Sequence, residues 1–188
     1  MQRDPLTIES LLALTALESL PRTGWVLRGV RTPETIGEHM LGVQWLCLAL
    51  AHPCGIDAER AIALALVHDA PEALLGDWPR SAAELLPQGA KRHAETQAAA
   101  QVLAPLGQRA RELWDEWQAQ VSPAARFVKV CDQLQLGVRL LRYAREGRSG
   151  LDEFLVTVRG IDTRGFAALE ELRCDLVRLL EAERALRA

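Results

Sequence analysis

The chain has 188 residues, of which 49% are hydrophobic and 25% are charged. This length and balance fit one folded domain that buries a core without disulfides, and they exclude a disordered chain. The net charge of −3 gives no electrostatic reason to bind a nucleic acid polymer, because such binding needs a clustered basic surface. We expect a cytoplasmic protein without a membrane segment, since we find neither a signal-peptide pattern nor eighteen consecutive uncharged apolar residues.

Residues that are typical of helix ends recur along the chain, whereas the alternation of apolar and polar residues that is typical of strands never persists beyond a few residues. Asp4 followed by proline predicts the start of a first helix, and the capping-box pair Thr35 and Glu38 predicts a second. Asp57 can cap a third helix, and Ser122 followed by proline predicts a later start. The segment 21–34 contains glycines and prolines, which is typical of an irregular stretch that lines a site. In chain order, the predicted helices of this all-helical bundle span about residues 5–20, 35–52, 57–69, 71–76, 89–103, 109–119, 122–145, 151–158 and 164–186.

Ionisable residues interrupt three of the apolar helical segments. In ERAIALALVHDAPEALLGDWPR, residues 59–80, an apolar run leads directly to His68 and Asp69. His39 lies in a second apolar segment and Asp132 in a third, so the order is His, His-Asp, Asp. Burying ionisable groups is unfavourable unless they are paired or bind a cation, and imidazole with carboxylate suits a divalent first-row ion. Alone, His39 would be interpreted as a core histidine and Asp132 as an exposed helical residue, but the ordered set favours metal ligands.

This ordered set resembles the signature of the HD-domain metal-dependent phosphohydrolases. The segments RTGWVLRGVRTPETIGEH, VHDAPEALLGDWP and ARFVKVCDQL look like the branch that contains the 5′-deoxynucleotidases, and the resemblance covers residues 8–146. It implies an all-α fold, a single-domain HD-domain helical bundle over residues 1–188. The metal-site core would lie at about 34–146, and C-terminal helices at 150–188 would pack on it or on a partner.

The resemblance implies a metal-dependent phosphomonoesterase, a 5′-(deoxy)nucleotidase that converts nucleoside 5′-monophosphates to nucleoside and phosphate. The cofactor would be one divalent ion, which nitrogen and oxygen ligands do not restrict further than Mn, Co, Fe, Ni, Zn or Mg. The implied ligands of this ion are His39, His68, Asp69 and Asp132. Glu72 and Asp77 would lie beside the metal, with Asp77 as water orienter or base and Glu72 as acid/base, and these two roles could be exchanged.

Phosphate binding calls for cations near the metal, and solvated surface charge is the alternative for each candidate. The candidates are Arg22, Arg28, Arg31, Lys91 and Arg92. In the 5′-deoxynucleotidase branch, an arginine-tryptophan pair upstream of the first histidine contacts the nucleotide, and Trp25 falls where that tryptophan would be. Here Gly24 precedes the tryptophan and Arg22 lies two positions earlier, so phosphate contact by Arg22 and the preference for a 2′-deoxy sugar stay open. Trp25 could instead belong to the core.

Two other functions stay open. One is a different HD-type phosphohydrolase that acts on a nucleoside triphosphate or an alarmone, and the other is a non-catalytic nucleotide-binding or assembly module. The expected partner is a small-molecule nucleotide substrate, and the resemblance also implies a homodimer. An apolar stripe on the C-terminal helix could form the dimer interface or pack on its own domain; it consists of Leu169, Leu172, Leu176, Leu179 and Leu180.

Overall fold

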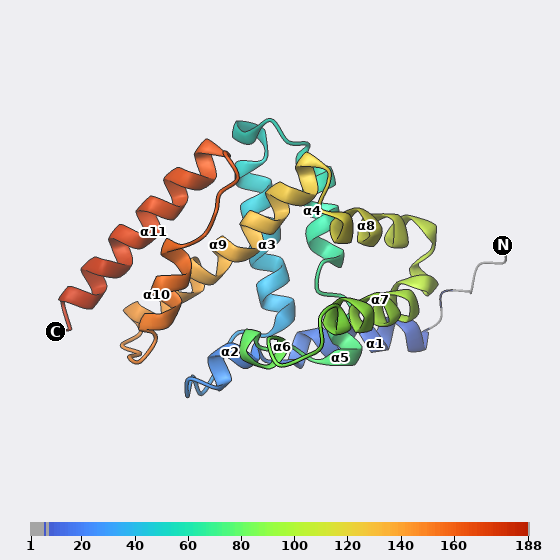
Figure 1. Ribbon diagram of the computed structural model, residues 1–188, viewed down its shortest axis with the longest axis horizontal. Coiled ribbons are helices and arrows are strands. Elements are labelled where there is room, and N and C mark those ends of the chain that lie inside the picture. Colours follow the sequence, from blue (N-terminus) through green and yellow to red (C-terminus); the bar gives the residue numbers. More distant parts are fainter. Residues whose placement is uncertain (1–5, 7, 188) are drawn as a thin grey trace. The chain divides into compact units, whose positions relative to one another are not determined.

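The structure, a computed structural model, describes residue 6 and residues 8–187, which form helices and no strand (Figure 1). The α-helices are α1 (Ile8–Ser19), α2 (Thr23–Val26), α3 (Ile36–Leu50), α4 (Ala58–Val67), α5 (Glu72–Leu75), α6 (Arg80–Ala83), α7 (Ala90–Leu103), α8 (Gln108–Ala119), α9 (Pro123–Arg145), α10 (Asp152–Arg159) and α11 (Ala167–Ala185). Two 3-10 turns, η1 (His52–Cys54) and η2 (Ala104–Leu106), follow α3 and α7. The prediction of an all-α fold is confirmed, and none of the described helices is both long and apolar enough to cross a membrane.

The predicted helix starts rest on the capping contacts that the sequence indicates. Thr35 and Glu38 form a reciprocal capping box, in which each side chain accepts a hydrogen bond from the other residue's main-chain N–H, at 3.1 and 3.0 Å. Asp57 Oδ1 accepts from two N–H groups in the first turn of α4, and Ser122 Oγ accepts from one in the first turn of α9. The predicted start at Asp4 lies outside the described residues.

One helix start and two short helices differ from the prediction. The last helix begins at Ala167 rather than near residue 164, because Arg164 (φ 53°) and Gly165 (φ 81°) adopt left-handed conformations that a right-handed helix cannot contain. The single-turn helices α2 and α6 lie in segments that we expected to be irregular. A helix of one turn is too short to show an apolar period, so the sequence gives no signal for it.

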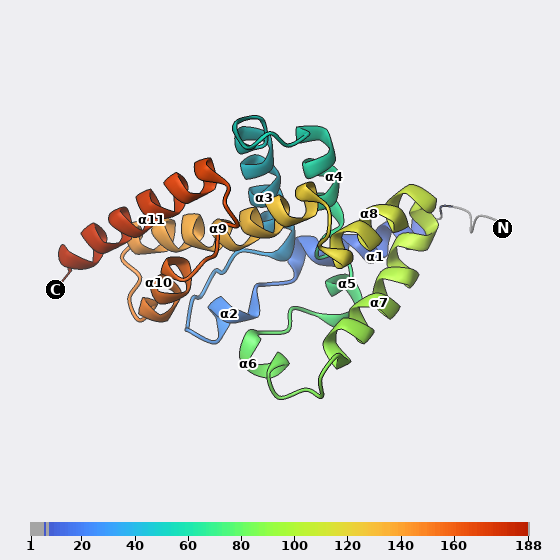
Figure 2. The ribbon, with the colours of Figure 1, turned by 45° about the horizontal axis from the view of Figure 1, so that its top comes forward.

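The described residues divide into two compact units, and the first contains those up to Leu41 together with Leu66–Ala119. In this unit α5 packs against α1 and α7, and α7 continues through η2 to α8, which packs back on α7 (Figure 2). A small core of buried side chains joins α1 to the start of α3. It consists of Leu17, Ile36 and Met40, with Leu14, Leu20 and Ala73 packed around them.

The second unit contains Gly42–Ala65 and the residues from Gln120 onward. Here α9 packs along both α10 and α11, as the ribbon shows (Figure 1). Gly137 of α9 permits this close approach, because a Cβ atom there would lie 3.0 Å from Leu176 Cδ1 and 3.3 Å from both methyl groups of Val158. Leu169, Leu176 and Leu180 are buried, so three of the five leucines in the apolar stripe of the C-terminal helix pack within this unit, whereas Leu172 and Leu179 are partly exposed.

Candidate metal centre

The His-Asp pair follows the last residue of α4. The helix ends at Val67, and Pro71 disfavours a helical conformation at the residue before it, so the chain turns at His68 and Asp69 before α5 begins. The carbonyl end of a helix favours a cation, since its dipole is negative there. His39 comes from the first turns of α3, where its N–H donates to the Thr35 carbonyl at 3.0 Å. Two helix ends thus bring these three residues together.

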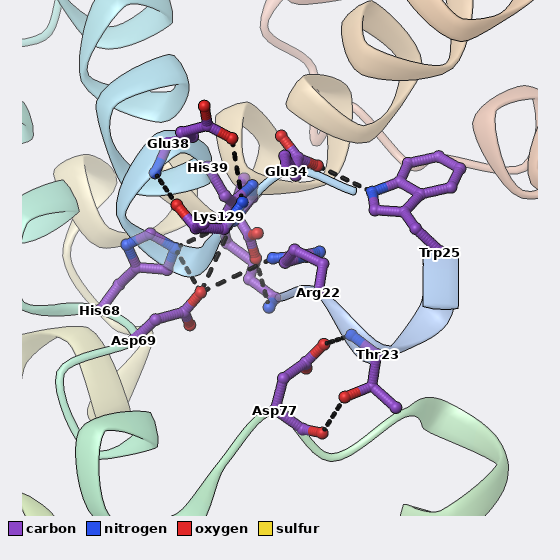
Figure 3. Close-up of polar contacts among 12 residues, drawn as sticks. Arg22, Thr23, Trp25, Glu34, Glu38, His39, His68, Asp69, Asp77 and Lys129 are labelled. Carbon is purple, nitrogen blue, oxygen red and sulfur yellow. Dashed lines mark hydrogen bonds and ion pairs between the residues drawn. The ribbon is translucent and has the colours of Figure 1, made fainter. Parts of the chain in front are cut away.

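The three side chains converge through their terminal atoms (Figure 3). His39 Nε2 and His68 Nε2 lie 3.4 Å apart, and Asp69 Oδ2 lies 3.6 Å from the first and 3.2 Å from the second. Both imidazoles are buried, at 0% and 3% exposure, whereas Asp69 is partly accessible. His39, His68 and Asp69 form the one group of three candidate ligands found among the described residues, with ligand atoms within 4.8 Å of one another.

These separations fit a shared ion. Two ligand atoms that each lie about 2.1 Å from one ion are about 3.0 Å apart at a right angle and about 3.4 Å apart at a tetrahedral angle. A donor set of two imidazole nitrogens and a carboxylate oxygen is common to zinc, iron, manganese and cobalt sites. The residues present therefore suit a divalent metal ion.

An aromatic contact holds one of the imidazoles. The ring of Trp117 on α8 stands edge-on to the ring of His68, with centroids 5.4 Å apart and an interplanar angle of 72°. The His39 and His68 rings make a second edge contact, also at 5.4 Å. Ring packing of this kind restricts rotation of the imidazole and so orients its Nε2 atom.

Asp132, the predicted fourth ligand, lies on α9 in the second unit, and its place in the metal site stays a prediction. Its side chain is 14% exposed, and Lys129 Nζ donates to its Oδ2 at 2.8 Å. We did not anticipate this ion pair, although a spacing of three residues on a helix makes such contacts available. The lysine compensates the charge of a carboxylate that is mostly withdrawn from water.

Glu72 is the first residue of α5, and its carboxyl group is largely enclosed. Its Oε2 is buried and has no hydrogen-bond partner among the residues that the structure describes. Burial, followed by the negative charges of Asp69 and Asp77, raises the pKa of Glu72 from 4.5 to about 10, against the opposing effect of Arg22 and Lys91. The protein groups alone thus keep this carboxyl protonated at neutral pH, in the form that can donate a proton.

Asp77 lies in the loop between α5 and α6 and contacts the segment around α2. Its Oδ2 accepts from the Thr23 N–H at 2.6 Å, and its main-chain oxygen accepts from the Thr23 hydroxyl at 2.8 Å (Figure 3). One carboxylate oxygen of Asp77 is therefore occupied by a peptide group 54 residues away in the chain. Thr23 carries no signal in the sequence that would have predicted this contact.

The candidate cations lie in different surroundings. Arg22 reaches the histidine-aspartate cluster, with Nη1 3.7 Å from Asp69 Oδ2 (Figure 3). Lys91 is partly exposed on α7, with Nζ 3.5 Å from Glu95 Oε1. Arg28 and Arg31 are exposed, and so is the further candidate Arg92. Substrate contact by these residues stays a prediction, but Arg22 is already beside a predicted metal ligand.

Trp25 is 1% exposed, and its indole N–H donates to Glu34 Oε1 at 2.9 Å. Glu34 is also 1% exposed. The sequence does not predict this burial, because a glutamate just before a helix start is normally a surface residue. The contact of Trp25 with a nucleotide stays a prediction.

Comparison with known proteins places this site in a family. The sequence pattern of the HD domain family matches residues 14–172 of this chain. The chain belongs to the HD-domain family. It is 33% identical to the 5′-deoxynucleotidase HDDC2 of Danio rerio over 150 residues, which cover 77% of this chain and 74% of that protein. It is 30% identical to the 5′-deoxynucleotidase hdd1 of Schizosaccharomyces pombe over 151 residues, or 75% of each chain.

A solved structure also resembles this fold. The PH0347 protein of Pyrococcus horikoshii superposes with a TM-score of 0.78 at 32% identity, covering 92% of this chain and 99% of that one. The resemblance that the sequence indicates, to HD-domain phosphohydrolases of the 5′-deoxynucleotidase branch, is thus confirmed.

Proposed function

We propose that this protein is a metal-dependent 5′-nucleotidase that hydrolyses nucleoside or deoxynucleoside 5′-monophosphates to the nucleoside and phosphate. The convergence of His39, His68 and Asp69 within 3.2–3.6 Å carries the proposal, because two imidazole nitrogens and a carboxylate oxygen at these distances suit a divalent ion. The names of the relatives support the substrate class, since proteins about 30% identical to this chain over three quarters of its length are 5′-deoxynucleotidases.

His39, His68 and Asp69, with Asp132 as the proposed fourth ligand, would hold the ion. A bound divalent ion neutralises charge on phosphoryl oxygens and makes water a better nucleophile at neutral pH. The ligands do not choose among Mn, Co, Fe, Ni, Zn and Mg. We propose one HD domain over residues 1–188, with the metal-site core at about 34–146.

The other residues have separate roles in the proposed reaction. Arg22 would bind the phosphate oxygens beside Asp69, with Arg28, Arg31 and Lys91 adding positive charge. Asp77 would accept a proton from the attacking water through the carboxylate oxygen that Thr23 does not occupy. Protonated Glu72 would donate its proton to the 5′-oxygen as the bond from phosphorus to that oxygen breaks, so that the leaving group departs as an alcohol.

We also propose a homodimer in the cytoplasm. α3 carries one charged residue, Glu38, and still exposes Leu41, Trp45 and Leu48 at 52%, 61% and 52%. These positions follow a helical spacing of four and three residues, so they form one apolar stripe that a second copy could cover. The four cysteines are unpaired thiols, which agrees with a reducing compartment.

Phosphate release from a panel of ribo- and deoxyribonucleoside 5′-monophosphates tests the activity. The assay uses manganese or cobalt and compares wild type with Asp69→Ala. We expect release that depends on the metal, is confined to monophosphates and is abolished by the substitution. The ratio of rates on dAMP and AMP then gives the sugar preference. Release from a triphosphate or an alarmone instead would favour another HD-type phosphohydrolase, and no release above the Asp69→Ala background would favour a binding role.

A further inference from the structure

A buried polar pair connects the segment around α2 to the start of α3. Glu34 and Trp25 are each 1% exposed, and the indole Nε1 donates to Glu34 Oε1 at 2.9 Å (Figure 3). Burying a carboxylate is costly unless it is hydrogen-bonded, and the bond to the indole offsets part of this cost. An apolar pair would fill the same space at lower cost, so the hydrogen bond fixes a geometry rather than adding to the core.

Main-chain contacts continue this connection. Pro21 and Thr35 form an isolated antiparallel bridge, and the Arg22 N–H donates to the Glu34 carbonyl at 2.9 Å. Glu34 therefore holds this segment twice, through its carbonyl at Arg22 and through its side chain at Trp25. Each contact restricts the backbone immediately before and after Thr23.

A second set of contacts holds the same segment from the other side. Thr23 binds Asp77 through both its N–H and its hydroxyl, at 2.6 and 2.8 Å. Arg22 lies between the two anchors, and its Nη1 is 3.7 Å from Asp69 Oδ2 (Figure 3). An arginine side chain has many rotamers, so a fixed backbone at its base limits where the guanidinium can reach.

We propose that Glu34 is a positioning residue for the substrate phosphate. Its hydrogen bond to Trp25 fixes residues 21–26, and this fixed segment presents the Arg22 guanidinium to a phosphate group beside Asp69. The proposal rests on the proposed 5′-nucleotidase function for its substrate. Glu34 thereby has a positioning role, and Trp25 has a second role besides its predicted contact with the nucleotide. In these positioning roles, neither residue contacts the reacting atoms.

Four variants separate the hydrogen bond from packing and from charge. Glu34→Met removes the acceptor but keeps the volume, and Glu34→Gln keeps an acceptor oxygen without the charge. Trp25→Phe removes the donor together with part of the ring volume and retains an aromatic ring, whereas Glu34→Met breaks the same hydrogen bond without that loss of volume. Glu18→Met, on the exposed face of α1, is the matched control for losing a glutamate in the same unit.

We expect the KM for a nucleoside monophosphate to rise about tenfold to a hundredfold in Glu34→Met and Trp25→Phe, because a charged phosphate contact is misplaced. The kcat should change by less than about threefold, since the proton donor Glu72 and the metal ligands are untouched. Glu34→Gln should stay within about threefold of wild type in KM, and Glu18→Met should equal it.

A double-mutant cycle shows whether the effect passes through Arg22. In an Arg22→Met background, Glu34→Met should raise KM by less than about threefold further, because residues that act through one another are not additive. Full additivity would overturn the proposal, as would an unchanged KM in both Glu34→Met and Trp25→Phe or a Glu34→Gln variant as impaired as Glu34→Met. If Glu34→Met does not fold, Trp25→Phe and Glu34→Gln make the same comparison.

Calorimetric titration with inorganic phosphate in the presence of manganese keeps this test independent of turnover. If wild type hydrolyses no nucleotide, the 5′-nucleotidase proposal fails, but the positioning proposal is still judged by phosphate affinity. We expect phosphate to bind about tenfold or more weakly to Glu34→Met and Trp25→Phe than to wild type and Glu34→Gln. Equal phosphate affinity in all four proteins would overturn the role of Glu34.

Discussion

Replacing Glu72 by glutamine tests the pKa that the surroundings give this carboxyl group. Folding raises the pKa from 4.5 to about 10, so the folded protein holds the proton more tightly than the unfolded chain does. The stability associated with this group is fully present below pH 4.5 and is lost as the pH rises toward 10. Glutamine has the same shape as protonated glutamate and does not ionise, so the variant should not lose this stability.

The magnitude follows from the pKa shift. Three pH units separate 4.5 from pH 7.5, and each unit corresponds to about 1.36 kcal/mol, which gives an upper limit of about 4 kcal/mol at pH 7.5. Partial exposure of the side chain and relaxation around it reduce this limit, so we expect Glu72→Gln to be more stable than wild type by about 1–3 kcal/mol at pH 7.5.

Urea unfolding at several pH values between 5 and 8.5, with a chelator to remove divalent ions, measures this difference. The stability advantage of Glu72→Gln should shrink as the pH falls toward 5, whereas the exposed control Glu18→Gln should show no such trend. A difference that is constant with pH, or a wild type that is the more stable protein at pH 8, would refute the assigned pKa. The same variant should lose about a hundredfold in kcat, because glutamine cannot donate the proton.

Three further substitutions test other parts of the structure. Asp132→Ala should weaken manganese binding, measured by calorimetry, by about tenfold or more if this residue is the fourth ligand. Trp45→Glu should convert the proposed dimer to a monomer in light scattering coupled to size exclusion, since it places a charge in the exposed stripe of α3. Gly137→Ala should lower the free energy of unfolding by about 1–3 kcal/mol, because its Cβ would crowd Leu176 and Val158.

Local signals explain what the sequence predicts correctly. A cap or a proline acts within four residues, so Thr35, Asp57 and Ser122 predict helix starts that the structure reproduces with the expected hydrogen bonds. The histidine-aspartate pair can be recognised for a related reason. Its apolar neighbours in the sequence predict burial, and burying ionisable side chains is unfavourable unless they bind a partner. The convergence of His39 with this pair follows from the family order of the ligands.

Contacts between distant segments explain what the sequence does not predict. Thr23 and Asp77 are 54 residues apart, and neither has a composition that marks it as a partner of the other. Glu34 is polar and adjoins a helix start, so its burial depends entirely on the fold bringing Trp25 over it. The short helix α2, which these contacts hold, has no apolar period of its own. The segment that we expected to line a site brings Arg22 to within 3.7 Å of Asp69, and its order comes from tertiary contacts.

Asp69 serves two groups at once, and this affects how its substitution is interpreted. Its Oδ2 atom lies 3.2 and 3.6 Å from the two imidazole nitrogens and 3.7 Å from Arg22 Nη1. Asp69→Ala therefore removes a proposed metal ligand and the anionic partner of the proposed phosphate-binding arginine together. Arg22→Met separates these effects, because it leaves His39, His68 and Asp69 in place. Manganese affinity that survives Arg22→Met but not Asp69→Ala would assign the ion to the carboxylate, and phosphate affinity that falls in Arg22→Met would assign the phosphate to the arginine.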